Sequence, residues 1–311
     1  MSRAVRLLVN PVSGGGRGEA VGRAVAGVLE AAGARVSVRR SAGPGDLPRL
    51  AQAAFQEPDT LVVVIGGDGS LHEVLAGAPE PLEPRPRLAV FGVGTGNDFL
   101  KMLGHADEAP AAAARRLLDA PLRAVDLIEL RAADGARHRI INNLGFGFLA
   151  EATRRTDAHH ERRGRRGGGR LPYILGGLGA LRHHEPVVAT LRLTSPARTE
   201  PEVLEGPFSL VHVGSGRYCG GGIDLTPEAR IDDGRMDLCA VSARGRGALA
   251  WLWPRLERGG GGLDGGVQRR SLTGLEIECG RVLAHLDGEV TELDGPLSLK
   301  LLPGAIDIAC P

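Results

Sequence analysis

The chain has 311 residues, which is enough to bury a sizeable core and suits two domains better than one. No stretch approaches the roughly 20 apolar residues that a membrane-spanning helix needs, although 42% of the residues are hydrophobic. The formal net charge of +1 and the aromatic content of 3% offer neither attraction nor stacking platforms for nucleic acid, so we expect no nucleic-acid partner.

Cysteine usage and the first residues bear on the compartment. The four cysteines lie far apart and form no CxxC pair: Cys219, Cys239, Cys279 and Cys310. This pattern is typical of reduced, mostly buried thiols in a cytoplasmic protein. The opening MSRAVRLLVNP holds too short an apolar run for a signal peptide and is expected to enter a strand directly. We therefore expect a cytoplasmic protein, which would reach any lipid substrate from the water side of a membrane.

The first third of the sequence alternates short apolar runs with apolar residues at helical spacing. The run LVVVI at 61–65 is typical of a strand buried on both faces. The expected strands are 6–9, 36–38, 61–65 and 88–91, and the expected helices are 19–32, 47–56, 70–77, 98–103 and 108–118. This order predicts a doubly wound parallel sheet covered by helices, with right-handed crossovers.

From about residue 123 the pattern changes to short alternating segments separated by Gly, Pro and Asp. The expected strands are 125–130, 139–142, 187–193, 208–213, 236–241 and 272–279. Such spacing is typical of an antiparallel sandwich or barrel. Two stretches interrupt it, namely an arginine- and glycine-rich loop at 154–170 and a helix with two tryptophans followed by a glycine run at 248–266.

The strongest local signal is the loop Gly66-Gly67-Asp68-Gly69-Ser70, between an expected strand and the next helix. Glycines let backbone N–H groups approach phosphate oxygens, and the helix dipole adds a favourable partial charge. Asp68 would repel phosphate unless a cation such as Mg²⁺ stood between them. Alternatively, the segment is a plain strand-to-helix turn in which Asp68 caps the helix.

Two more glycine-containing loops follow other expected strands, NPVSGGG at 10–16 and GVGTGNDF at 92–99. All three loops leave the carboxyl ends of strands, so in one parallel sheet they would line the same edge. No GxxxxGK[ST] occurs, and GxGxxG is absent from the first turn, which argues against a P-loop protein and a dinucleotide dehydrogenase. The convergence of the three loops favours a phosphate-binding site.

In this order the loops resemble the diacylglycerol kinase catalytic domain family, which includes sphingosine, ceramide and bacterial lipid kinases. NPVSGGGRG is similar to the family's NPxSG, VVVIGGDGSLHEV to its GGDGT block and GVGTGNDF to its PxGTxNDF block. Later signatures are matched by NLGFGFLA at 143–150, by GGGIDLTPEA at 220–229 with DDGRMD at 232–237, and by DGE at 287–289. The six matches cover nearly the whole chain.

The resemblance implies an α/β plus all-β fold. An N-terminal nucleotide-binding α/β domain would span residues 1–122, joined again by the last segment at about 296–311, and an antiparallel β-sandwich lipid-substrate domain would span 123–295. ATP would lie in the cleft between the domains. The implied activity is that of an ATP- and Mg²⁺-dependent lipid kinase, with diacylglycerol as the favoured acceptor.

The resemblance also implies site residues at the matching positions. Nucleotide contacts would come from Asn10, Ser41, Gly66, Gly67, Asp68, Gly69, Ser70, Leu71, His72, Gly94, Thr95, Asn97 and Asp98. Asp68 would serve the catalytic Mg²⁺. A structural Mg²⁺ in the second domain would be held by Asp233 and the main-chain carbonyls of Arg230 and Arg235, although Asp-Asp-Gly is equally typical of a tight turn.

Glu289 would be the general base. Phosphoryl transfer to an alcohol needs a group that positions the hydroxyl and accepts its proton late, which a carboxylate can do. The alternative is an exposed acid in a hairpin. The departures from the family pattern are mild: Ser70 replaces threonine, His72 replaces asparagine and Gly92 replaces proline.

The lipid side is less well marked. The basic loop at 154–170, followed by the apolar segment 171–181, could dock on an anionic membrane surface. Alternatively, the loop is simply solvated and the helix after it belongs to the core. The sequence does not specify which lipid is the acceptor or what the oligomeric state is, and a homodimer is one option for the latter.

Three other functions compete with lipid phosphorylation. NAD kinase shares a GGDG loop and the two-domain plan, but no TPTGSTAY-like segment occurs. Phosphofructokinases use GGDGS, yet the short first domain and the β-rich remainder fit them poorly. A non-catalytic nucleotide or lipid sensor would not need to keep Asp68 and Glu289.

Overall fold

The computed structural model describes residues 4–57, 59–94, 96–104, 109–163, 171–260 and 266–311. The chain divides into two compact units, one formed by residues 1–125 and 304–311 and the other by residues 126–303. No helix within the described ranges is both long and apolar enough to cross a bilayer.

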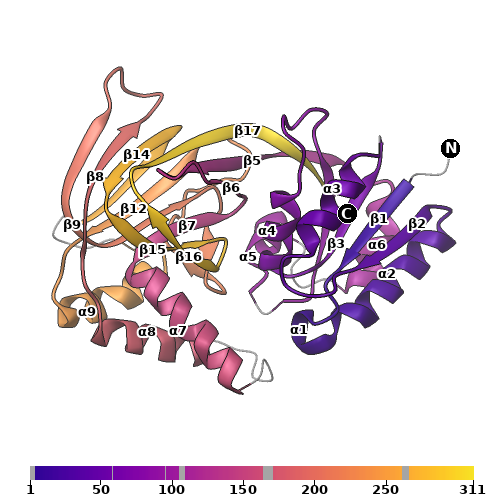
Figure 1. Ribbon diagram of the computed structural model, residues 1–311, viewed down its shortest axis with the longest axis horizontal. Helices are drawn as coiled ribbons and strands as arrows, with labels where there is room; N and C mark the ends of the chain where they lie inside the picture. The colour runs from indigo at the N-terminus through magenta and orange to yellow at the C-terminus, as the bar shows by residue number, and fades with distance from the viewer. Residues whose placement is uncertain (1–3, 58, 95, 105–108, 164–170, 261–265) are drawn as a thin grey trace. The chain divides into compact units, whose positions relative to one another are not determined.

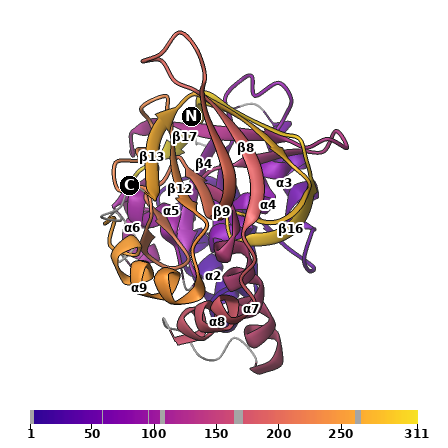
Figure 2. The same ribbon diagram turned by 90° about the vertical axis from the view of Figure 1, so that its left-hand side faces the viewer.

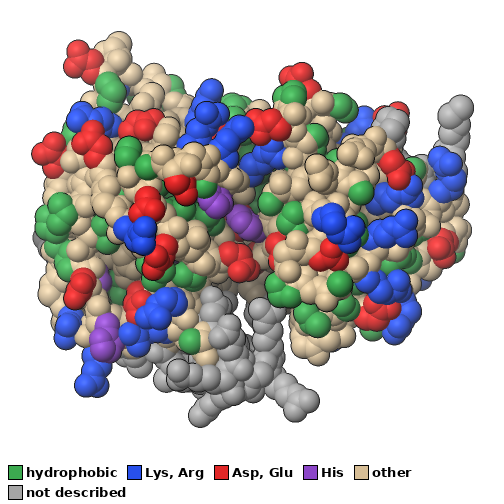
Figure 3. Space-filling model, viewed as in Figure 1, with side chains coloured by type: hydrophobic (Ala, Val, Ile, Leu, Met, Phe, Trp, Pro, Cys, Tyr) green, Lys and Arg blue, Asp and Glu red, His purple; other side chains and the backbone are tan. Residues whose placement is uncertain are grey.

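The N-terminal unit is built on a parallel sheet in the order β4-β3-β1-β2, as the sequence predicts. Its strands are β1 (Ala4–Val9), β2 (Arg35–Arg40), β3 (Leu61–Gly66) and β4 (Arg87–Gly92). The end of β17 (Leu297–Ala309) adds a further parallel neighbour, pairing Asp307 with Arg87. Basic and acidic side chains are interspersed on the face of this unit seen in Figure 3, in keeping with the net charge of +1.

Helices cover both faces of the parallel sheet. They are α2 (Gly18–Ala31), α3 (Leu47–Phe55), α4 (Asp68–Ala76), α5 (Asp98–Leu103) and α6 (Pro110–Leu117), preceded by the short α1 (Ser13–Gly16). Alternate residues of β3 pack with α2 and α6 in one hydrophobic cluster, while α3 and α4 contact the strand as well. Every residue of β3 is therefore buried, which explains its unbroken apolar sequence.

The C-terminal unit is an antiparallel β-sandwich. Its longer strands are β5 (Leu122–Arg131), β6 (Arg137–Ile140), β7 (Asn143–Gly147), β8 (Val187–Thr194), β9 (Glu202–Gly214), β12 (Met236–Ser242), β13 (Val267–Leu272), β14 (Gly274–Cys279), β15 (Arg281–Leu286) and β16 (Glu289–Asp294), and a small hairpin pairs β10 (Tyr218–Cys219) with β11 (Ile223–Asp224). One order of neighbours runs β16-β15-β7-β9-β8-β14-β17, and β12 joins β9 to β13. Every second residue along several of these strands belongs to the main hydrophobic core of the unit.

The helices of the sandwich unit are α7 (Phe148–Arg163), α8 (Leu171–Arg182) and α9 (Arg246–Leu256). The first two are side by side in both views of the ribbon (Figures 1 and 2). Buried residues of these helices form two further apolar clusters with residues of β9, β12 and the small hairpin.

The expected loop at 154–170 was wrong over its first part, because α7 continues to Arg163. The helix buries Phe148 and Ala152 on one side. On another side Glu151 pairs with Arg154 at 2.7 Å and with Arg155 at 2.5 Å, at helical spacing of three and four residues. Residues 164–170 of the expected loop lie outside the described part of the chain.

The single strand expected at 272–279 was also wrong. The chain changes partners at Thr273, so β13 pairs with β12 whereas β14 pairs with β8 and β17. The alternation of apolar residues continues across this corner and gives no sign of the change in partner.

Candidate active site

Three loops of the N-terminal unit meet at the carboxyl edge of its sheet. The side-chain amide of Asn10, after β1, donates to the Ser70 hydroxyl in the first turn of α4 at 3.0 Å. The Asn10 N–H donates to the Ile65 carbonyl at 3.0 Å, and the Val93 N–H donates to the Gly66 carbonyl at 2.9 Å. The loops after β1, β3 and β4 are thus joined directly to one another.

Glycines make this meeting possible. A Cβ on Gly67 would lie 3.2 Å from the Cα of Gly94, and a Cβ on Gly14 would lie 2.1 Å from the Val93 carbonyl oxygen. Gly14 also has a φ of +60°, in the left-handed region. Backbone therefore packs on backbone at Gly67 and Gly14, where an added side chain would have too little room.

Asp68 begins α4 and faces the next helix. Its carboxylate accepts the N–H of Asp98 at 3.0 Å and the N–H of Phe99 at 3.2 Å, which are the first residues of α5. The alternative in which Asp68 caps its own helix was wrong, because α4 has no side-chain cap hydrogen bond and Asp68 instead accepts the first N–H groups of α5. The bonds from Asp98 and Phe99 hold the Asp68 carboxylate at the start of both helices.

The loop after β4 is held by its own side chains. Asn97 has a φ of +49°, and its amide donates to the Gly94 carbonyl at 3.1 Å. Asp98 is buried, and its carboxylate accepts Lys101 Nζ at 2.7 Å. Thr95, an expected nucleotide contact, lies outside the described residues.

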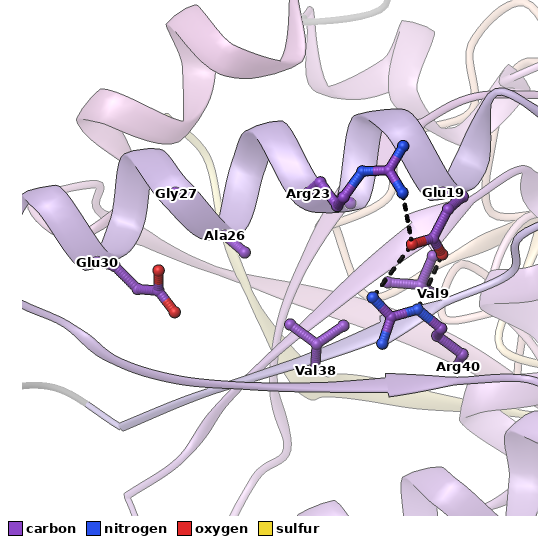
Figure 4. A pocket seen from close by; sticks show the side chains of 9 residues that line it. Val9, Glu19, Arg23, Ala26, Gly27, Glu30, Val38 and Arg40 are labelled. Atoms are coloured by element: carbon purple, nitrogen blue, oxygen red, sulfur yellow. Dashed lines mark hydrogen bonds and ion pairs between the residues drawn. The ribbon is translucent and has the colours of Figure 1, made fainter.

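Ser41 follows β2 and lies next to the first loop. Its N–H donates to the Val9 carbonyl at 2.9 Å, and its hydroxyl donates to the Gly43 carbonyl at 2.7 Å. A pocket of about 270 Å³ opens beside this point between α2 and β2, with Val9 and Val38 in its wall (Figure 4). Glu19 in this pocket pairs with Arg40 at 2.9 Å.

The remaining expected residues of α4 differ in exposure. Leu71 is 1% exposed, so its side chain belongs to the core and only its backbone is open to a ligand role. Gly69 and His72 are half-buried on the first turns of the helix.

Arg17 is a site residue that the sequence reasoning missed. Its guanidinium donates to the Gly14 carbonyl at 2.9 Å and to the Val93 carbonyl at 3.4 Å, so it fastens the first loop to the third. The signal available was its place directly after the glycine run NPVSGGG. Lys101 was missed as well, although it stands three residues after Asp98.

Glu289 lies in the C-terminal unit as the first residue of β16, and it is exposed. The turn before it uses Asp287 and Gly288, with φ of +50° and +93°. Asp287 is only 6% exposed, and its carboxylate accepts the N–H groups of residues 141, 142 and 143 at 3.1, 2.9 and 3.0 Å. The Asp of the DGE motif thus anchors the hairpin that presents Glu289.

The expected second magnesium position is a tight turn. Asp233 accepts the Arg235 N–H at 3.1 Å, and Gly234, with a φ of +73°, donates its N–H to Asp126 at 2.7 Å. Arg230 pairs with Asp232 at 3.6 Å. The described residues contain no cluster of three or more His, Cys, Asp or Glu side chains arranged for a metal ion.

Comparison with known proteins identifies the family. Residues 4–130 match the sequence model of the diacylglycerol kinase catalytic domain, and residues 142–310 match that of the YegS C-terminal NAD kinase beta sandwich-like domain. A Stenotrophomonas maltophilia (strain K279a) protein named "Probable lipid kinase YegS-like" is 32% identical over 90% of this chain and 88% of its own length. The chain belongs to the YegS-like lipid kinase family.

Further similarities agree with this placement. A Pseudomonas fluorescens (strain Pf-5) protein of the same name is 32% identical to this chain, and the match covers 93% of this chain and 90% of that protein. A crystal structure of a Bacillus anthracis str. Sterne protein has a TM-score of 0.77 at 25% identity, covering 99% of this chain and 97% of that one. Another from the same organism, described as a diacylglycerol kinase, has a TM-score of 0.73 at 23% identity and the same coverage, which shows the fold alone. This chain is accordingly an enzyme, an ATP-dependent kinase.

Proposed function

We propose that this kinase transfers the γ-phosphoryl group of ATP to a lipid hydroxyl, and that diacylglycerol is the acceptor and phosphatidic acid the product. The observation that carries the proposal is the junction of glycine loops at the sheet edge, where Asn10 meets Ser70 and Gly67 meets Gly94. Glycine-rich loops let backbone N–H groups come close to phosphate oxygens. The family to which the chain belongs supplies the acceptor class.

The nucleotide would be held by the loops of the N-terminal unit. The amino terminus of α4 follows Gly66 and Gly67 directly, so its dipole favours a phosphate there. Asn10, Gly94 and Asn97 would complete the cradle. Ser41 and His72 would contact other parts of the nucleotide, and Thr95 is assigned on the motif alone.

Asp68 would hold the Mg²⁺ that accompanies ATP. Magnesium in kinases is bound by one or two carboxylates together with phosphates and water, so a cluster of three protein ligands is not needed. The two N–H bonds from α5 fix the direction of the Asp68 carboxylate, and carboxylate oxygens are ligands that Mg²⁺ prefers. The ion would neutralise phosphate charge during transfer.

Glu289 would position the lipid hydroxyl and accept its proton. Its exposed carboxylate stands at the start of a strand, on a hairpin anchored by Asp287. Because the backbone around Glu289 is already ordered, its carboxylate would need little reorganisation free energy during phosphoryl transfer.

A second Mg²⁺ would lie in the C-terminal unit at Asp233, with the carbonyls of Arg230 and Arg235. Because the proposed ligand set contains one carboxylate and two carbonyls, water would complete the shell. A rise in thermal midpoint with added Mg²⁺ should disappear in Asp233→Asn and persist in Asp134→Asn, another turn aspartate.

The lipid would be reached by peripheral contact with an anionic membrane. Of the arginines between 154 and 170, Arg154 and Arg155 are paired with Glu151, which weakens their part in such contact. Replacing the arginines between 162 and 170 by serine should reduce sedimentation with anionic vesicles, and unchanged sedimentation would remove that segment from the proposal.

The acceptor is tested by incubating the enzyme with radiolabelled ATP, Mg²⁺ and either diacylglycerol in detergent micelles or NAD. We expect label in phosphatidic acid. Label in NADP instead would favour NAD kinase activity, which the NAD kinase-like description of the second domain makes the relevant alternative. Absence of label in a panel of glycerol and sphingoid lipids would overturn the proposal.

A further inference from the structure

Helix α9 buries one side and leaves the other exposed among the residues that the structure describes. Leu249, Leu252 and Leu256 are at most 2% exposed and join the apolar clusters beneath the helix. Trp253 packs edge-on against Phe148, with ring centroids 4.8 Å apart. The indole N–H of Trp253 donates to Glu257 at 2.9 Å. The inner side of α9 is therefore fully used within the C-terminal unit.

Trp251 stands on the opposite side and is 57% exposed. A large ring in water is unfavourable, and this chain has only two tryptophans. The guanidinium of Arg255 lies over the Trp251 ring at 3.8 Å from its centroid, and it also donates to the Trp251 carbonyl. The exposed ring and the cation thus form one unit on the surface.

The charge of this side is uniformly positive. Arg255 and Arg258 lie on this side at helical spacing from Trp251, and Arg246 stands at the amino end of the helix. All three are exposed, and no ion pair between described residues engages them. The one acid between residues 245 and 260 is Glu257, which is bound to Trp253. An exposed aromatic ring among unpaired arginines matches the headgroup region of an anionic bilayer, where tryptophan rings gather and phosphates accept guanidinium bonds.

We propose that the outer side of α9, formed by Trp251, Arg255 and Arg258, docks together with Arg246 at the amino end of the helix on a membrane that carries anionic phospholipids. Trp251 enters the headgroup layer while the arginines bind lipid phosphates. Attraction of basic residues to an anionic surface strengthens binding by on the order of fivefold for each residue. The inference rests on the proposed lipid substrate, because docking would bring the enzyme to the layer where that substrate resides.

The test uses the full chain with vesicles of phosphatidylcholine and phosphatidylglycerol. In Trp253→Phe, Trp251 is the sole tryptophan, and its emission should shift to the blue on addition of anionic vesicles. The triple variant Arg246→Ser, Arg255→Ser, Arg258→Ser and the single variant Trp251→Ala should each bind these vesicles at least tenfold more weakly.

A matched control removes the same charge elsewhere. Arg35, Arg39 and Arg115 are exposed in the N-terminal unit, and their serine variant should bind like the wild type. Unshifted Trp251 emission, wild-type binding by the α9 variants, or equal loss in the control would overturn the proposal.

Catalysis separates this inference from the proposed function. The α9 variants should phosphorylate diacylglycerol in neutral detergent micelles at the wild-type rate and lose activity only on vesicles. Vesicle binding through α9 by a protein that phosphorylates no lipid would sink the proposed function and leave the docking surface standing. Wild-type activity of the α9 variants on vesicles would overturn the docking proposal and leave the function intact.

Discussion

At the scale of single residues, carboxylates in this protein act by holding backbone. Asp68 receives two N–H groups of α5, and Asp287 receives three from the segment before β7. Both aspartates belong to motifs, GGDGS and DGE, for which the sequence predicts a role in catalysis or ligand binding. Each therefore fixes the geometry of a loop on which a reacting group or a ligand would depend.

We predict that Asp287→Ala lowers the free energy of unfolding by about 3 kcal/mol, because it strands buried N–H groups that now bond to a charged acceptor. Urea denaturation measures the change. Asp134→Ala, which removes a carboxylate from an exposed turn, should cost under about 1 kcal/mol. Equal effects of the two substitutions would contradict the anchoring role of Asp287.

The loop junction gives a second prediction at this scale. Gly14→Ala should weaken ATP binding at least tenfold, because its Cβ would lie 2.1 Å from the Val93 carbonyl oxygen. Gly15 has a similar φ of +72°, but a Cβ added there would meet no atom within 4 Å, so Gly15→Ala carries the backbone strain alone. Titration with a fluorescent ATP analogue compares them, and equal affinities would show that the close approach is unimportant.

At the scale of elements, three neighbouring strands of the sandwich bring two histidines together. Gly145 on β7 pairs with His212 on β9 and with His285 on β15, and the two rings stack over the glycine with centroids 6.1 Å apart. Both are almost fully buried. Within the described residues, neither ring nitrogen of His212 has a hydrogen-bond partner.

Burial lowers the pKa of both histidines. The pKa of His285 falls from 6.5 to about 4, although the negative charge of Asp287 acts to raise it. The pKa of His212 falls well below 6.5, and the charge on His285 lowers it further. The unfolded chain therefore binds more protons below pH 6.5. Stability is fully present above that pH and is lost as the pH falls toward the folded-state pKa, by up to about 1.4 kcal/mol per pH unit for each histidine.

Denaturation between pH 7 and 4.5 measures this slope. We expect His212→Leu to make it shallower and His183→Gln, at an exposed position, to leave it unchanged. An unaltered slope in His212→Leu would show that His212 does not contribute to the acid sensitivity.

At the scale of the whole molecule, the sequence was sufficient for the order of strands and helices in the N-terminal unit and for the meeting of the three loops. Strand β3 and its loop are encoded locally, by an unbroken apolar run followed by glycines. What the sequence could not show depends on distant partners. Asp287 accepts N–H groups from residues that precede it in the chain by 144 to 146 positions. Strand β14 pairs with β8, which is also distant in the sequence, whereas β13 pairs with β12.

Helix α7 was missed for a related reason. Its sequence is dominated by charged residues, so its apolar periodicity is weak. The ion pairs of Glu151 and the packing of Phe148 against Trp253 stabilise it instead. Strongly charged segments can thus form helices where a neighbouring element covers their few apolar residues.

The central claim is that the N-terminal unit holds ATP while Glu289 of the C-terminal unit activates the lipid hydroxyl. The most direct measurement is the rate of phosphatidic acid formation by Glu289→Gln at saturating ATP and Mg²⁺, with Glu292→Gln on the same strand as the control. We predict a loss of about 10²-fold or more in Glu289→Gln, with unchanged ATP affinity, since general bases contribute at least that much. A wild-type rate in Glu289→Gln would contradict the claim.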